Sequence, residues 1–158
     1  MTVEKFSYEY EMEYIFSYTA HLEAEPIGPV ADGLRINFNF TGGEIIGQNI
    51  KGVLGKVGAD WLTIRTDGVG ILDIRGTITT DDGAKVYLAY NGIMDLGPNG
   101  YDAFLNGSEP PAEIQLRGNP HFQVAEPKYE WLNRGFFVNI GKAILSENIV
   151  KFDVYRVN

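Results

Sequence analysis

The sequence predicts an all-β protein in which residues 1–158 form one domain. Apolar side chains alternate with polar ones along several segments, which is the period of a strand with one buried face. Short clusters of Gly, Asp, Asn and Pro separate these segments, as turns do between neighbouring strands. No stretch of ten residues has the apolar spacing of a helix. Many strands in one domain form a sandwich or a barrel.

The N-terminal part alternates most regularly. Residues 10–22 keep a period of two over their whole length, with Ile15 as the exception. Residues 25–33 carry two prolines and two glycines, so this stretch is predicted to be a loop. The elements expected next are a strand at 34–40, a turn at 41–44 and a strand at 45–54.

A meander of three strands follows, and its strands are expected at 60–66, 69–81 and 84–92. Asp67-Gly68 and Asp82-Gly83 join them, and Asp-Gly between alternating segments favours a two-residue type I′ turn. The remaining elements are an irregular stretch at 95–112 with a helical turn near 101–105, then strands at 113–118, 121–125, 135–144 and 148–157.

Two-residue turns would fix which residues of the meander lie opposite one another. Asp60 would face Arg75, and Arg75 would face Tyr90, so that these side chains form one row, with Asp73 on the same face. A guanidinium beside a phenol would lower the pKa of Tyr90 or orient its hydroxyl to stabilise an oxyanion. A cross-strand salt bridge beside a packed tyrosine is the structural alternative.

A second set of candidate residues could bind a ligand. Tyr129, Trp131 and Asn133 alternate, as side chains on one face of a strand do. Two aromatic rings and an amide could form one wall of a pocket for a planar molecule, or pack in the core. Trp61, which falls on the face opposite Asp60, and His121 complete the candidate binding residues.

The composition argues against several classes of protein. The chain has no cysteine and two histidines, so we expect no thiolate nucleophile, no metal site and no cofactor. A net charge of −8 argues against nucleic acid and against anionic membrane surfaces as partners. The N-terminal residues lack the pattern of a signal peptide, and no apolar stretch approaches the length of a membrane span. A cytoplasmic protein is therefore expected.

Several ordered motifs resemble the domain-of-unknown-function 3237 family. They are Gly58-Ala59-Asp60-Trp61, Leu72-Asp73-Ile74-Arg75, Tyr90-Asn91-Gly92, Pro120-His121-Phe122, Tyr129-Glu130-Trp131-Leu132-Asn133-Arg134 and Val154-Tyr155-Arg156-Val157. The resemblance implies a single-domain antiparallel β-barrel, lipocalin-like in outline, with an interior pocket. Some members belong to pathways for aromatic or polyketide metabolites, which implies cofactor-free ring closure, isomerisation or lyase chemistry. Gln123, where the family often has an acid, and the stretch 95–112 depart from the pattern.

Three hypotheses follow. In the first, the protein is a cofactor-free isomerase, lyase or cyclase for a planar aromatic or enone-type small molecule. Tyr90 acts as acid or oxyanion donor, Arg75 fixes charge, and Asp60 or Asp73 orients Arg75 or accepts a proton. In the second, the same pocket belongs to a non-catalytic binding or carrier protein. In the third, the barrel is structural and its interior is filled. A homodimer is possible in each case.

Overall fold

The computed structural model describes residues 1–158 and consists almost entirely of antiparallel strands. The strands are β1 (Met12–Val30), β2 (Gly33–Gly47), β3 (Lys51–Leu54), β4 (Ala59–Ile64), β5 (Val69–Thr80), β6 (Lys85–Asp95), β7 (Ile114–Gly118), β8 (His121–Val124), β9 (Phe136–Ile144) and β10 (Ile149–Val157). The helical elements are α1 (Gly100–Leu105), η1 (Pro127–Asn133) and η2 (Leu145–Glu147). The helical turn expected near 101–105 is confirmed by α1.

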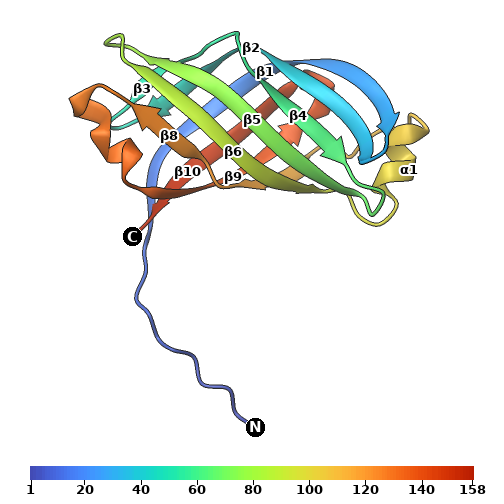
Figure 1. Ribbon diagram of the computed structural model, residues 1–158, viewed down its shortest axis with the longest axis horizontal. Helices are drawn as coiled ribbons and strands as arrows, with labels where there is room; N and C mark the ends of the chain where they lie inside the picture. Colours follow the sequence, from blue (N-terminus) through green and yellow to red (C-terminus); the bar gives the residue numbers. More distant parts are fainter.

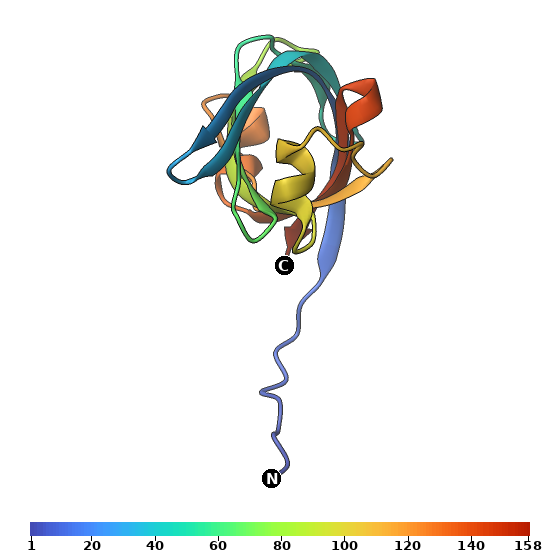
Figure 2. The same ribbon diagram turned by 90° about the vertical axis from the view of Figure 1, so that its right-hand side faces the viewer.

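The strands close into a β-barrel, as the family resemblance implied. Hydrogen-bonded neighbours run in the order β5-β4-β2-β1-β10-β9-β7-β6, and β6 pairs with β5 to complete the ring. Strand β3 pairs with both β2 and β5, and β8 pairs with β6. Figures 1 and 2 show α1 across one mouth of the barrel and η1 at the opposite end. None of the helices has the length and apolar character needed to cross a membrane.

The barrel interior is the hydrophobic core. Alternate residues of each strand point inward, and 28 buried apolar side chains form a single cluster there. Three polar side chains are buried as well: Asp60, Thr80 and Asn139. A polar group inside an apolar barrel needs a hydrogen-bond partner or a function.

The first hairpin is longer than the sequence predicted. Strand β1 continues to Val30, so the loop expected at 25–33 is wrong. Its pairing with β2 shifts at two bulges, one of which absorbs the turn expected at 41–44. Strand β1 pairs with β10 only as far as His21, so Pro26 and Pro29 lie on an edge where a missing N–H is tolerated.

The two hairpins of the meander have three-residue loops, so the predicted register is wrong by one residue at each. Arg65 and Val69 close the first loop, and Thr80 and Ala84 close the second. The last loop residues, Gly68 and Gly83, have φ of +89° and +91°. Such a loop combines a turn with a glycine bulge, and Asp-Gly suits it as well as it suits the two-residue turn.

The corrected register changes the row that the sequence predicted. Asp60 lies opposite Ile74, and Ile74 lies opposite Tyr90, whereas Arg75 lies between Ala59 and Ala89. A shift of one residue turns Arg75 to the outer face. The two shifts cancel across β5, so Asp60 and Tyr90 still share one row and both point into the barrel.

Candidate functional site

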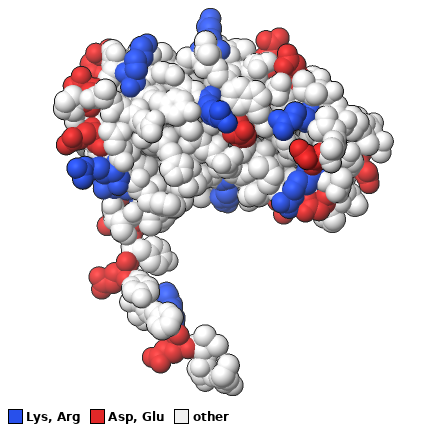
Figure 3. All heavy atoms as spheres, in the orientation of Figure 1, with Lys and Arg blue, Asp and Glu red and all other residues white.

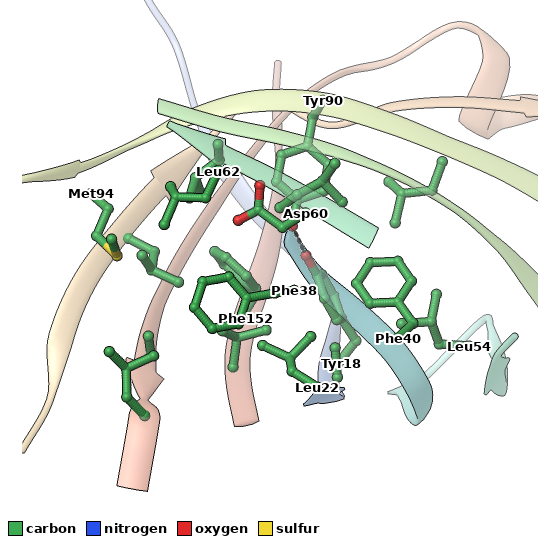
Figure 4. A pocket seen from close by; sticks show the side chains of 18 residues that line it. Tyr18, Leu22, Phe38, Phe40, Leu54, Asp60, Leu62, Tyr90, Met94 and Phe152 are labelled. Carbon is green, nitrogen blue, oxygen red and sulfur yellow. Dashed lines mark hydrogen bonds between the residues drawn. The ribbon is translucent and has the colours of Figure 1, made fainter. Parts of the chain in front are cut away.

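A narrow cavity lies inside the barrel. Eighteen residues line it, and 17 of them are hydrophobic (Figure 4). The centre of a water-sized sphere fits into only about 30 Å³ of the space among these side chains. The apolar side chains therefore nearly fill the interior, and a ligand larger than a few waters needs side chains to move apart.

Two tyrosine hydroxyls meet in this cavity. Tyr18 comes from β1 and Tyr90 from β6, and their hydroxyl groups form a hydrogen bond (Figure 4). Burial is the main cause that raises the pKa of each phenol, so both stay protonated. A bond between two hydroxyls uses one of their two hydrogens. The other hydrogen is then free to bind an oxygen atom of a ligand.

Asp60 supplies the only carboxyl group of the cavity lining. It is 9% exposed, and its Oδ1 accepts the backbone N–H of Asp73 at 2.9 Å. Burial raises the pKa of Asp60 to about 7, against the opposing effect of this hydrogen bond. The negative charge of Asp60 also raises the pKa of both Tyr18 and Tyr90, so the carboxyl group and the two phenols are electrostatically coupled. An acid with this pKa can take up and return a proton near neutrality.

The backbone is opened locally to hold this carboxyl group. The β4–β5 ladder pairs Asp60 with Ile74 and resumes at Thr63 with Ile71. Between these pairs the N–H of Asp73 is bound by Asp60 itself. On the β6 side of β5, the carbonyl of Leu72 accepts Asn91 Nδ2 at 3.1 Å. The side chain of Asp60 thus satisfies a backbone N–H that the β4–β5 ladder leaves free.

Asn139 on β9 is the fourth polar residue of the interior. It is completely buried, and its Nδ2 donates to the Tyr18 hydroxyl at 3.3 Å. Its Oδ1 has no hydrogen-bond partner and lies against Gly118, where a Cβ would come within 2.3 Å of it. Gly118 on β7 therefore leaves room for the Asn139 side chain, which reaches Tyr18 across the intervening strand β10.

Phe152 on β10 fixes the orientation of the tyrosine rings. It stacks on Tyr18 with the centroids 5.1 Å apart and meets Tyr90 edge-to-face at 6.1 Å. Both arrangements are favourable for aromatic pairs. Strands far apart in the sequence thus bring Tyr18, Asp60, Tyr90 and Asn139 together; we call these four residues the interior polar cluster.

The charged partners predicted for Asp60 and Tyr90 lie outside the barrel. Arg75 is 59% exposed, and its guanidinium is 3.8 Å from Asp73 and 5.8 Å from the ring centroid of Trp61. Trp61 is itself half-buried on the outer face. The acid and the indole that are adjacent in the sequence thus point to opposite sides of the strand, as strand geometry requires. Of the residues predicted to be catalytic, Asp60 and Tyr90 line the cavity, and Arg75 and Asp73 do not.

The aromatic wall predicted at 129–133 does not form. This segment is the 3₁₀ helix η1, in which residues two apart point in different directions. Tyr129 is buried and donates its hydroxyl to Asp82 at 2.9 Å. Trp131 packs against Phe137 at 6.4 Å between centroids, outside the cavity lining. Asn133 is exposed and bonds the backbone of Val124 in both directions. This segment therefore braces one end of the barrel.

His121 is exposed at the start of β8 and is not part of the cavity lining. No group of three or more His, Cys, Asp or Glu side chains is arranged to hold a metal ion.

Sequence reasoning missed Tyr18 and Asn139. Tyr18 falls between Phe16 and Ala20 on the apolar side of a regular alternation, a pattern that places its ring on the apolar face but gives its hydroxyl no role. Asn139 alternates with the buried Phe137 on β9, and a polar side chain at an inward position is a detectable signal. The contacts of Tyr18 with Tyr90 and with Asn139 could not be seen, because these two residues are 72 and 121 positions away from Tyr18 in the sequence.

The family follows from a match over nearly the whole sequence. Residues 10–157 match the family described as "Protein of unknown function (DUF3237)". The chain belongs to the DUF3237 family. A UPF0311 protein of Rhodopseudomonas palustris is 34% identical over 150 residues, which cover 93% of this chain and 96% of the relative. One from Clostridium acetobutylicum is 30% identical over 154 residues, with 95% and 96% covered.

Solved structures share the barrel. A β-barrel-like protein from Acinetobacter baumannii superposes with a TM-score of 0.82 at 26% identity, covering 98% of this chain and all of that one. The structure of the conserved Rhodopseudomonas palustris protein of unknown function gives 0.81 at 30% identity, with 96% of this DUF3237 chain and all of that one covered. A structure described as an enzyme from Penicillium herquei gives 0.67 at 18% identity, with coverages of 99% and 100%, and shares the fold.

Proposed function

We propose that this DUF3237 protein binds a neutral, largely apolar small molecule inside the barrel and catalyses a cofactor-free proton transfer on it. The observation that carries the proposal is the buried carboxyl group of Asp60 beside the hydrogen-bonded Tyr18 and Tyr90, in a cavity that is otherwise apolar. A structural barrel has no need for a carboxyl group that burial disfavours in its charged form.

The lining limits the class of substrate. The cavity contains no Lys, Arg or His, so it offers no counter-ion to a carboxylate or a phosphate. Aromatic and aliphatic side chains suit a planar hydrocarbon frame, and the hydroxyl pair suits one carbonyl or phenol oxygen. A planar phenol or enone of the kind implied by the family resemblance meets these requirements.

The interior polar cluster can catalyse an isomerisation in which one proton is removed from the substrate and returned to it at another carbon. Ionised Asp60 removes a proton from the carbon beside a carbonyl group, and the carbonyl oxygen becomes an enolate that accepts a tyrosine hydrogen bond. Protonated Asp60 then returns the proton to another carbon, and the enolate collapses to the shifted enone. In a ring closure, Asp60 instead takes a phenol proton, the phenolate oxygen bonds to the β-carbon, and Asp60 protonates the α-carbon.

A carrier without catalysis is the second candidate, because the apolar cavity with its hydroxyl pair offers a carrier the same binding surface. Apolar side chains that must move apart for entry retain a ligand without any chemistry. The fold likeness to a Penicillium herquei protein described as an enzyme supports catalysis only by analogy.

The test is a thermal-shift screen of the purified protein against planar phenols, chalcone-like enones and small lactones, with absorbance followed over time. We expect ligands of this class to stabilise the protein and to show a time-dependent spectral change. Asp60→Asn and Tyr90→Phe should keep binding and lose turnover, whereas Arg75→Gln on the outer face should keep both. Binding by the native protein without any spectral change would establish the carrier, and turnover that survives Asp60→Asn would remove Asp60 from its role.

The rate should also depend on pH. Because Asp60 acts as a base only when it is ionised, kcat/KM should rise with pH and level off above its pKa of about 7. A pH–rate profile of the native protein on any substrate found in the screen checks this. A flat profile between pH 5 and pH 8 would contradict the proposed base.

A further inference from the structure

The N-terminal segment carries an apolar face that nothing in its own chain covers. Residues 1–11 lie outside the barrel. Figure 1 shows the segment leaving the body near the C-terminus, and Figure 3 shows it extending away from the body. Phe6, Tyr8 and Tyr10 alternate with polar residues and are 84%, 81% and 71% exposed. Such alternation is the pattern of a strand with one buried face, although this face is bare.

The apolar face continues onto the barrel. Met12 and Tyr14 on β1 continue the alternation at every second residue after Tyr10, and they are also exposed. Met12 pairs with Val157, which pairs with the exposed Phe136, so this row widens the face across β10 and β9. The apolar side of the segment therefore leads into an apolar patch on the outer wall. β1 itself begins at Met12 and Ser7 has a φ of +36°, so the segment becomes a regular strand only when a partner strand pairs with it.

The backbone of this region can accept a further strand. β1 begins to pair with β2 only at Phe16, so the edge at Met12–Tyr14 is unpaired on that side. Glu11 exchanges both backbone hydrogen bonds with Asn158, where β10 ends. The other free edge of β1, near Val30, carries two prolines that hinder pairing, whereas the N-terminal edge carries no proline and has a single register shift, between Tyr14 and Phe16.

The segment is complementary to itself in one antiparallel register. When Tyr8 lies opposite Tyr8 of a second copy, Phe6 lies opposite Tyr10, and Lys5 lies opposite Glu11. Aromatic rings then meet on one face and opposite charges meet on the other. A two-fold axis through Tyr8 relates the two copies, which gives a closed interface.

We propose that two copies of this chain associate through antiparallel pairing of residues 5–11 about Tyr8. The segment of each copy also runs beside the unpaired edge of the other copy's β1, where it covers Met12. The barrel interior takes no part in this contact, so the association is independent of any activity there.

Light scattering coupled to size-exclusion chromatography tests the charge pairing. The full chain should elute at twice its mass of 17.6 kDa. Lys5→Glu places like charges opposite each other and should shift the protein toward the monomer, with an increase in Kd of about tenfold. The double variant Lys5→Glu/Glu11→Lys should restore the dimer. A monomeric native protein, or a dimer that Lys5→Glu leaves unchanged, would overturn the proposal.

Cross-linking tests the register, and the absence of cysteine makes single-cysteine variants clean reporters. Tyr8→Cys should form a disulfide-linked dimer, because directly opposite residues are about 5 Å apart. Phe6→Cys is the matched control, since its two copies would lie four residues out of register, roughly 13 Å apart along the strands. Cross-linking of Phe6→Cys as fast as that of Tyr8→Cys would contradict the register.

Discussion

Asp60 shows how one residue couples the barrel to pH. A carboxyl group in water has a pKa near 4, whereas burial raises the pKa of Asp60 to about 7. In the folded protein the proton is therefore bound more tightly than in the unfolded chain. Between these two values, the folded state holds a proton that the unfolded state has lost.

The free energy of unfolding should therefore fall as pH rises. The contribution of Asp60 is fully present below about pH 4 and is lost by about pH 7, with a total of about 4 kcal/mol. Asp60→Asn keeps an oxygen for the N–H of Asp73 but carries no charge, so it should be more stable than the native protein at pH 8. Urea unfolding at pH 5 and pH 8 measures the difference, and the half-exposed Asp73→Asn is the control. If the native protein and Asp60→Asn lose equal stability between these pH values, burial does not raise the pKa of Asp60 as proposed.

The tyrosine pair should behave as a unit. Tyr18→Phe leaves the buried Tyr90 hydroxyl and the amide of Asn139 without their partner, at a cost of about 1–3 kcal/mol. Tyr90→Phe leaves Tyr18 bonded to Asn139 and should cost less. The double variant should cost less than the sum of the two single variants, because no hydroxyl is then left unpaired. Chemical unfolding of the four proteins gives the coupling energy, and additive losses would mean that the hydroxyls do not interact.

At the level of elements, the hairpin loops decide which side chains enter the barrel. Gly68 and Gly83 have nearly the same positive φ, but their surroundings differ. A Cβ on Gly68 would lie 1.7 Å from the carbonyl oxygen of Gly97, whereas a Cβ on Gly83 would meet nothing within 4 Å. The two glycines are therefore a matched pair that separates backbone strain from steric contact.

Gly83→Ala should destabilise the protein by about 1–2 kcal/mol, which is the cost of a left-handed residue with a Cβ. Gly68→Ala should cost clearly more, because the loop around Gly97 must also move. Thermal or urea unfolding of both variants checks this order. A smaller loss for Gly68→Ala would show that the contact with the Gly97 loop is not maintained in solution.

Alternation predicted most strands and the inward side of β1, because burial of one face enforces a period of two. Loop length was not predictable, since Asp-Gly fits loops of two and of three residues, and this difference placed Arg75 on the wrong face. The segment 129–133 alternates in sequence but follows Pro127 and forms η1, because its side chains find partners on neighbouring loops. Within the site, Asp60 and Tyr90 were predictable and Tyr18 and Asn139 were not, since closure of the barrel brings them together.

At the level of the whole molecule, a closed ring of strands leaves few exposed edges. Residues Phe16–Ala20 of β1 pair with β10 on one side and β2 on the other, whereas Glu23–Val30 pair only with β2. Amide hydrogens with partners on both sides open only when the barrel opens.

Hydrogen exchange followed by mass spectrometry should show this difference within a single strand. Peptides covering Phe16–Ala20 should exchange slowly, close to the rate set by global unfolding, and peptides covering Glu23–Val30 should exchange much faster. Equal protection over the whole of β1 would mean that another surface covers the hairpin end, and the closed ring would not be the source of the pattern.

The lengths of the two three-residue loops together determine which residues of β5 face the barrel interior alongside Asp60 and Tyr90. Loss of one residue from a single loop would leave Asp60 and Tyr90 on opposite sides of the wall, so one length change alone dismantles the cavity. Loss of one residue from both loops would keep that pair aligned but replace Ile74 by Arg75 between them, and would put a cation in an apolar interior. The two loops can therefore change length only together. A homologue in which both loops are one residue shorter must also have apolar residues at the β5 positions that face outward here, and polar residues at those that face inward here.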